Sequence, residues 1–171
     1  MRARWTSAIF AAVTTLLAGQ AACAPKDSDD KAIWFGKADH AMNASVDEAR
    51  ATLPIFWKHL EQDREVRHFL IKVAFPTSHG GVEHLWIGLT STDEKALHGE
   101  ILNEPEDVPN VHAGQPYEIT EPSKISDWSY EKAGKFYGQF TTRAMLKAMD
   151  EKGRAEQLEV LAPTPLEPGD R

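Results

Sequence analysis

Residues 68–102 read HFLIKVAFPTSHGGVEHLWIGLTSTDEKALHGEIL, and this stretch decides the fold. Apolar and polar side chains alternate through Phe69–Phe75, through Glu83–Thr90 and through Ala96–Leu102, which is the period of β-strands. A proline and a pair of glycines separate the first two runs, as expected of a turn. The short separations predict three antiparallel strands that follow one another as a meander.

Helices are expected on both sides of this meander in the sequence. A capping box at Ser45–Glu48 predicts the start of a helix whose apolar residues recur at helical spacing. Pro54 lies inside that pattern and predicts a kink, or two short helices that meet there. Near the other end, Thr141 or Thr142 is expected to cap a last helix that Gly153 closes.

Three shorter runs, Tyr117–Thr120, Ile125–Glu131 and Lys135–Phe140, are candidate strands between the meander and the last helix. The sequence therefore predicts an α+β domain, an antiparallel meander sheet of about five strands packed with an N-terminal and a C-terminal helix. The helices are expected to cover one face of the sheet.

The composition limits both the stabilising forces and the partners. The chain has 171 residues, which suits one domain, and its one cysteine excludes an internal disulfide. There are 26 acidic against 19 basic side chains, a formal net charge of -7. This balance argues against nucleic acid as a partner, because binding to phosphates needs a basic surface.

Residues 1–22 have the pattern of a secretory signal peptide, in which two arginines precede an apolar run over residues 8–18. The run is too short to span a hydrocarbon core of roughly 30 Å. Cys23 follows a series of small residues, an order that resembles a bacterial lipoprotein signal. Lipidation of Cys23 and ordinary cleavage just before it are both open. We expect an exported protein, periplasmic or anchored by lipid in the bacterial envelope.

Composition also divides the rest of the chain. Residues 23–38 are mostly small and polar, as in a tether, and residues 39–161 are expected to form the domain. Residues 162–171 contain three prolines and a glycine, which predicts an extended or disordered tail.

One face of the predicted sheet is expected to carry side chains that could bind a ligand or exchange protons. In the register that the alternation predicts, His84, Trp86 and His98 share the face opposite the aliphatic one with Lys72 and Glu100. Antiparallel sheets commonly leave one face in water, so this arrangement can be an ordinary solvated face. An exposed indole would need a partner, which makes a ligand-binding face the alternative.

Asp127, Trp128 and Arg143 complete the candidate ligand-binding residues. Asp127 can accept backbone N–H bonds and so cap a turn, or it can form a buried pair with the guanidinium of Arg143. Catalysis would require His84, as acid or base, to meet Asp127 or Glu83 within hydrogen-bond reach. No motif of a catalytic nucleophile or of a phosphate-binding loop is present.

The histidines do not form a metal motif. His79, His84, His98 and His112 are 5, 14 and 14 residues apart, which matches none of the common zinc-binding arrangements. The sequence therefore predicts neither a metal site nor a cofactor.

Four short motifs occur in one order: Glu83-His84-Leu85-Trp86, Asn103-Glu104-Pro105, Ile125–Tyr130 and Gly134–Arg143. This set resembles the YegJ-like bacterial family, domain of unknown function 2314, over about Asp39–Leu146. Ser129 and Gln139 depart from the family pattern, in which methionine and a second glycine are common. The resemblance implies a compact α+β domain and no established activity.

These observations favour a noncatalytic binding or interaction module in the cell envelope, with an envelope protein or a small ligand as its partner. Two alternatives stay open. One is an envelope hydrolase that uses His84 with Asp127 or Glu83. The other is an inhibitor or immunity-like protein whose acidic surface occludes a basic enzyme.

Overall fold

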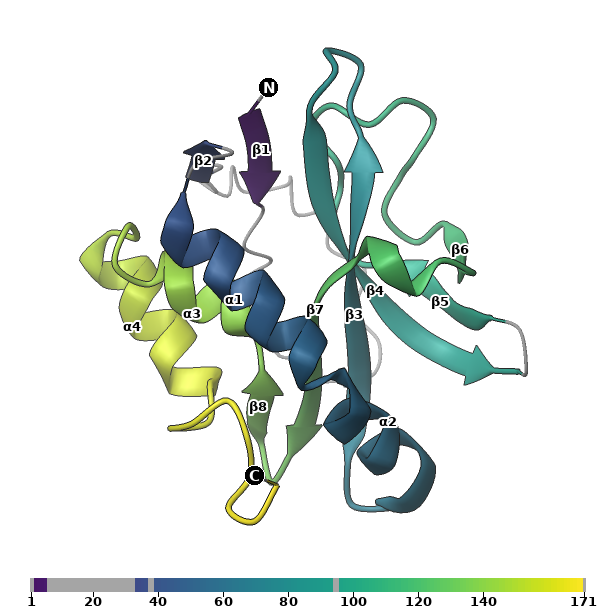
Figure 1. The fold of residues 1–171 in the computed structure, drawn as a ribbon, viewed down its shortest axis with the longest axis vertical. Helices are drawn as coiled ribbons and strands as arrows, with labels where there is room; N and C mark the ends of the chain where they lie inside the picture. Colours follow the sequence, from purple (N-terminus) through teal and green to yellow (C-terminus); the bar gives the residue numbers. More distant parts are fainter. Residues whose placement is uncertain (1, 6–32, 37–38, 94–95, 171) are drawn as a thin grey trace, which may run out of the picture.

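A computed structural model of the chain describes residues 2–5, 33–36, 39–93 and 96–170, which form one sheet with helices packed against it (Figure 1). The elements in chain order are β1 (Arg2–Trp5), β2 (Ile33–Gly36), α1 (His40–Ala51), α2 (Leu53–Gln62), β3 (Arg67–Pro76), β4 (Val82–Thr92), β5 (Leu97–Ile101), β6 (Pro116–Ile119), the 3₁₀ turn η1 (Pro122–Lys124), β7 (Ile125–Lys132), β8 (Lys135–Gly138), α3 (Phe140–Met145) and α4 (Glu151–Val160).

The sheet has the order β2-β1-β4-β3-β7-β8, and β5 continues from β4 with β6 at its side. Strands β3, β4 and β5 pair antiparallel, which confirms the meander in residues 68–102. All pairings among β3 to β8 are antiparallel, whereas β1 pairs with β4 in parallel. The α+β class is confirmed. The six antiparallel strands β3 to β8 compare with about five expected, and the pair β1 and β2 joins the same sheet through β4.

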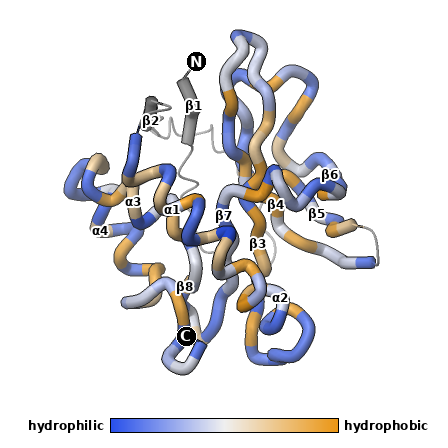
Figure 2. The backbone as a smooth tube through the Cα atoms, in the orientation of Figure 1, coloured by the Kyte–Doolittle hydropathy of each residue, from blue (hydrophilic) through white to orange (hydrophobic). Residues whose placement is uncertain are grey.

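Helices α1 and α2 cover one face of this sheet. Pro54 lies in the first turn of α2, so the predicted break is confirmed as two helices that meet at this proline. Phe56 of α2 packs edge-on against Phe69 of β3, with 5.5 Å between the ring centroids. The Trp128 indole donates to the carbonyl of Ala49 in α1 at 2.9 Å. Figure 2 shows hydrophobic residues along the central strands β3 and β4.

The C-terminal part of the chain covers the opposite face, which the sequence predicts to be uncovered. Trp86 and Leu70 are 1% and 3% exposed there, packed with Phe136 and Leu161. The interpretation of this face as solvated, with an exposed indole, is therefore wrong for Lys72, His84 and Trp86, whereas Glu100 in β5 is exposed as expected. Alternation identifies residues that share a face, but it carries no information on what covers that face.

Two helix boundaries differ from the prediction. The Ser45–Glu48 box lies inside α1, where the Ser45 hydroxyl donates to the carbonyl of Met42. The helix begins after Asp39 instead, whose Oδ1 accepts a hydrogen bond from the Met42 backbone N–H at 2.9 Å. Ser and Asp satisfy the same N-terminal donors, so the sequence alone does not choose between them.

The predicted last helix is two helices, α3 and α4. Asp150 caps α4 by accepting from the backbone N–H of Gly153 at 2.7 Å, so Gly153 lies in the first turn and not at the end. The residue before α3 is Gln139 in the left-handed conformation, with φ 55°, which turns the chain sharply out of β8.

The C-terminal residues after α4 are ordered against the domain, contrary to the predicted disordered tail. The Ala162 N–H donates to the Phe136 carbonyl at 2.9 Å, and the Gly138 N–H donates to the Pro165 carbonyl at 2.7 Å. Leu166 is 7% exposed and joins the main core. Proline-rich chain is extended, and here it lies along β8.

Part of the predicted N-terminal tether forms a strand, since β2 lies in residues 23–38, where Ile-Trp-Phe has high β-propensity. Strand β1 lies within the predicted signal peptide. The apolar run over residues 8–18 and Cys23 fall outside the described residues. None of the helices that the structure describes has the length and hydropathy needed to span a bilayer.

Candidate functional site

A row of buried polar residues crosses the second face of the sheet. Lys72 of β3 lies between its cross-strand neighbours, Trp86 of β4 and Asp127 of β7, and none of the three is more than 1% exposed. The Lys72 ammonium lies 4.8 Å from the centre of the Trp86 ring and donates to Thr141 Oγ1 at 3.1 Å. The indole therefore stabilises a buried cation and is not available as a binding platform.

Burial changes the pKa values of both charged members of this row. Removal from water lowers the pKa of Lys72 to about 8, against the attraction of Asp127, which raises it. The pKa of Asp127 is raised, first by burial, whereas the charge of Lys72 and the bonds from Thr141 act in the opposite direction. Each charge thus offsets part of the cost of burying the other.

Asp127 holds the start of α3 against β7. Its Oδ1 accepts from the backbone N–H groups of Trp128 and Phe140 at 2.8 and 3.1 Å, and its Oδ2 accepts from the N–H and hydroxyl of Thr141 at 2.8 and 2.5 Å. These four bonds use the acceptor capacity of the carboxylate. The prediction that Asp127 accepts backbone N–H bonds is confirmed, but its donors at the start of α3 lie 13 and 14 residues along the chain and not in a local turn.

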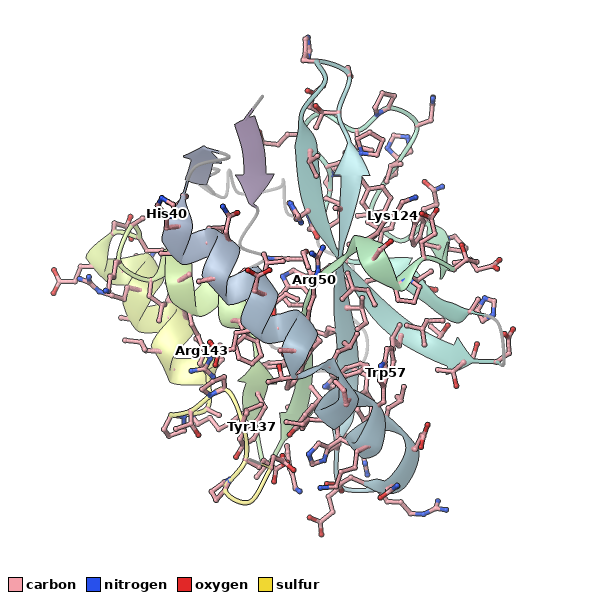
Figure 3. All side chains as sticks on the ribbon, viewed as in Figure 1. His40, Arg50, Trp57, Lys124, Tyr137 and Arg143 are labelled. Carbon is pink, nitrogen blue, oxygen red and sulfur yellow. The ribbon has the colours of Figure 1, made fainter. Side chains whose placement is uncertain are left out.

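Arg143 does not form the alternative pair with Asp127. Its Nε donates to the Gly138 carbonyl at 2.9 Å, and its Nη2 lies 3.4 Å from the carbonyls of Phe136 and Thr164. Arg143, labelled in Figure 3, thereby ties α3 to β8 and to the C-terminal segment. A guanidinium that is engaged with three carbonyls serves the fold.

His84 is buried at 7% exposure, with Nδ1 2.8 Å from Ser126 Oγ. Burial, followed by the charges of Lys72 and Arg50, lowers the pKa of His84 to about 3. The imidazole is therefore neutral at ordinary pH and poorly suited to act as a general acid.

Glu83, the next residue along β4, points to the other face and is also buried. Its carboxylate accepts from the backbone N–H groups of Glu106 and Asp107 at 3.0 Å each, which fixes the loop after β5. The structure thus engages both candidate carboxylates, Asp127 and Glu83, with backbone donors rather than with His84.

The remaining predicted site residues lie apart from this row. Trp128 is on the opposite face beneath α1 and is fully buried. His98 lies in the β4–β5 hairpin, where its Nε2 is 2.8 Å from Asp93 Oδ2. Of the six candidates, His84, Trp86, Asp127 and His98 share a face by register, but only the first three lie in its buried part, where they are packed rather than arranged around a cavity.

A groove of about 350 Å³ opens elsewhere, between the end of α2 and the β4–β5 hairpin. None of the predicted ligand-binding residues lines it. The lining residues are Trp57, Leu60, Glu61, Thr92, Asp93, Ala96, Leu97, Ile119, Thr120, Pro122 and Ile125. Figure 3 labels Trp57 where α2 faces β5. The sequence places Trp57 and Leu60 on the apolar stripe of a helix, a pattern that indicates core and gives no signal of partial exposure.

Comparison with known proteins places the chain in a family. The sequence profile of DUF2314, described as an uncharacterized protein conserved in bacteria, matches residues 39–161. The chain belongs to this family. The uncharacterized protein YegJ of Escherichia coli K12 is 30% identical over 117 residues, which cover 68% of this chain and 74% of YegJ. The resemblance to YegJ-like proteins is thus confirmed.

A second relative is a putative ankyrin repeat protein of Neisseria meningitidis serogroup B, 32% identical over 136 residues. The match covers 74% of this chain but 53% of the relative, so the chain spans about half the length of that protein. No solved structure matches the chain.

Proposed function

We propose that the chain is a noncatalytic binding module of the bacterial envelope whose contact surface is the groove beside α2. One contrast carries the proposal. The groups that could act as acids or bases, on His84, Glu83 and Asp127, are buried and bonded to the fold. Trp57 and its neighbours instead line a groove that is open to solvent. Groups held in buried structural bonds are poorly placed to exchange protons with a substrate.

The groove has the chemistry of a site for a peptide segment. Its apolar lining includes Trp57, Leu60 and Leu97, each partly exposed, and Glu61 and Asp93 add exposed carboxylates. Apolar pockets with charged rims select partners by burial at the centre and by charge at the edge. The expected occupant is an extended segment with apolar side chains flanked by lysine or arginine. The net charge of -7 favours the approach of such a partner.

The named relative is consistent with an interaction role. A region similar to this chain occurs in a protein named as a putative ankyrin repeat protein. Ankyrin repeats stack into extended binding surfaces. A domain in a protein of that name is more simply understood as an interaction module than as an enzyme.

Export is the second part of the proposal and is supported by the sequence of residues 1–23. Cleavage before Cys23 would remove β1 and uncover the β4 edge at Val82–His84. The matched family region begins at residue 39, so the strands β3 to β8 would stay whole.

Mass spectrometry of the membrane fraction tests export and lipidation. Acylated Cys23 would support the lipid anchor, and cytosolic protein that retains residues 1–22 would contradict export.

Photocrosslinking in cells tests the groove. A photoreactive side chain replaces Trp57 or Leu97, and both positions are expected to capture the same protein. Leu158 on α4, which is 55% exposed and lies away from the groove, is the control position.

Charge reversal at Glu61 and Asp93 should reduce capture if the partner segment is basic. Equal capture from position 158, or none from positions 57 and 97, would contradict the proposal. A captured basic enzyme that loses activity on binding would make the module an inhibitor.

A further inference from the structure

Three potential metal-binding atoms from α2 and the C-terminal segment converge on one point. They are His59 Nε2, Glu167 Oε1 and Asp170 Oδ2, which all lie within 4.8 Å of one another. His59 Nε2 is 2.9 Å from Asp170 Oδ2 and 3.7 Å from Glu167 Oε1. The His59 and Asp170 side chains are 8% and 6% exposed, so the point lies largely out of solvent.

The remaining atom of each side chain binds a neighbour on the outer side. His59 Nδ1 lies 3.3 Å from Asp63 Oδ2. Glu167 Oε2 lies 2.9 Å from Lys132 Nζ. Asp170 Oδ1 lies 3.2 Å from Lys58 Nζ. Tyr130 also donates its hydroxyl to Glu167 Oε1 at 3.0 Å. Outer partners of this kind orient the side chains that bind a metal, and a carboxylate on the far nitrogen of a histidine is typical.

A proton or a metal ion is needed among the three converging atoms. If His59 donates its Nδ1 proton to Asp63, then Nε2 directs a lone pair at two carboxylate oxygens. Such close acceptors repel one another unless a cation lies between them. Ligands of a tetrahedral zinc ion, bound at about 2.0 to 2.1 Å, are about 3.3 Å apart, and the two distances from His59 Nε2 lie on either side of this value.

We propose that His59, Glu167 and Asp170 bind one divalent transition metal ion, with Zn²⁺ as the best match to one nitrogen and two oxygen ligands. A fourth position would be filled by water. Because His59 belongs to α2 and the carboxylates follow α4, the ion would fasten the C-terminal segment to α2. The site lies apart from the groove and does not depend on the proposed binding function.

The full chain, freed of metal by a chelator and then titrated with Zn²⁺ alone, tests the site. Calorimetry should show one ion per chain, and saturating Zn²⁺ should raise the Tm by mass action. Asp170→Asn and Glu167→Gln keep the side-chain shape and should each weaken binding at least about tenfold. Asp63→Asn, which removes an outer partner, should weaken binding roughly 10-fold to 100-fold.

The His98–Asp93 pair supplies the matched control. Its nitrogen and oxygen are 2.8 Å apart, but the side chains are 36% and 56% exposed. His98→Ala should leave the Zn²⁺ affinity unchanged. Two results would overturn the site. Absence of Zn²⁺ binding, with ¹⁵N spectra that show both nitrogens of His59 protonated, assigns the central position to a proton. Undiminished binding in Asp170→Asn places the ion elsewhere.

Discussion

Asp127 and Thr141 are joined twice through one carboxylate oxygen, which accepts from the Thr141 backbone N–H at 2.8 Å and from its hydroxyl at 2.5 Å. The same hydroxyl accepts a hydrogen bond from the Lys72 ammonium. Thr141 thus lies between a buried cation and a buried carboxylate, and it connects β3, β7 and α3. This link explains why polar residues can occupy the second face of the sheet without contact with water.

Removing the Asp127 carboxylate should be strongly destabilising. Asp127→Ala leaves two backbone donors of α3 unpaired and removes the negative charge beside Lys72, so we expect a loss of about 3 to 5 kcal/mol in the free energy of unfolding. Urea denaturation at pH 7 measures it. Asp150→Ala removes an exposed cap and should cost only about 1 kcal/mol. Equal losses in the two variants would contradict the buried network.

His84 should make stability depend on pH. Its pKa is about 3 in the folded chain and 6.5 ordinarily, because burial disfavours the imidazolium. As the pH falls below 6.5, the unfolded chain takes up a proton that the folded chain refuses until about pH 3. The free energy of unfolding therefore falls between pH 6.5 and about pH 3, by about 1.4 kcal/mol per pH unit.

Urea denaturation of the parent and of two variants at pH 7.5 and pH 4.5 tests this dependence. The comparison isolates the histidine because the carboxylates contribute equally to the pH dependence of all three proteins. His84→Gln should lose less stability than the parent between the two pH values. His79→Gln, at a side chain that is 87% exposed, should lose as much as the parent. Identical losses in all three proteins would show that His84 takes up its proton normally in the folded state.

Gly138 should tolerate no side chain. Two effects contribute, backbone strain and a steric clash, and Gly134 serves as a control that has only the first. Both glycines have positive φ, +72° and +74°, so alanine is strained at each by roughly 1 to 2 kcal/mol. At Gly138 a Cβ would also lie 2.2 Å from the Trp128 carbonyl, whereas at Gly134 nothing lies within 4 Å. Thermal denaturation should show a clearly larger fall in Tm for Gly138→Ala. Matching falls would mean that the backbones do not approach as described.

Leu166 tests whether the C-terminal segment belongs to the core. The side chain is 7% exposed, and Leu166→Ala should cost about 2 to 4 kcal/mol through lost burial and the cavity left behind. Leu158→Ala, at a side chain that is 55% exposed, should change stability by less than about 0.5 kcal/mol. If the Leu166→Ala variant is as stable as the Leu158→Ala control, the C-terminal segment is not part of the core, and the disordered tail predicted from its prolines is correct.

Local pattern was sufficient for the central elements of this protein. The alternation in residues 68–102 predicted β3, β4 and β5, and Pro54 predicted the junction of α1 and α2. Each of these features follows from the backbone of a few neighbouring residues, which fixes a period of two or removes one donor. That Asp127 accepts backbone N–H bonds was predicted from the residue type, because short carboxylates often do so, but its partners at the start of α3 were not.

Tertiary packing decided the rest. The burial of Trp86 depends on Leu161, and the cluster at His59 depends on Glu167 and Asp170, more than a hundred residues further along the chain. No local window records such contacts, because the free energy of covering a face belongs to both segments together. The amino-acid sequence by itself determined the strands, the helix junction and the α+β class. Only the folded chain decided which polar side chains became structural and which surface stayed open, because those outcomes depend on which distant segments exclude water from them.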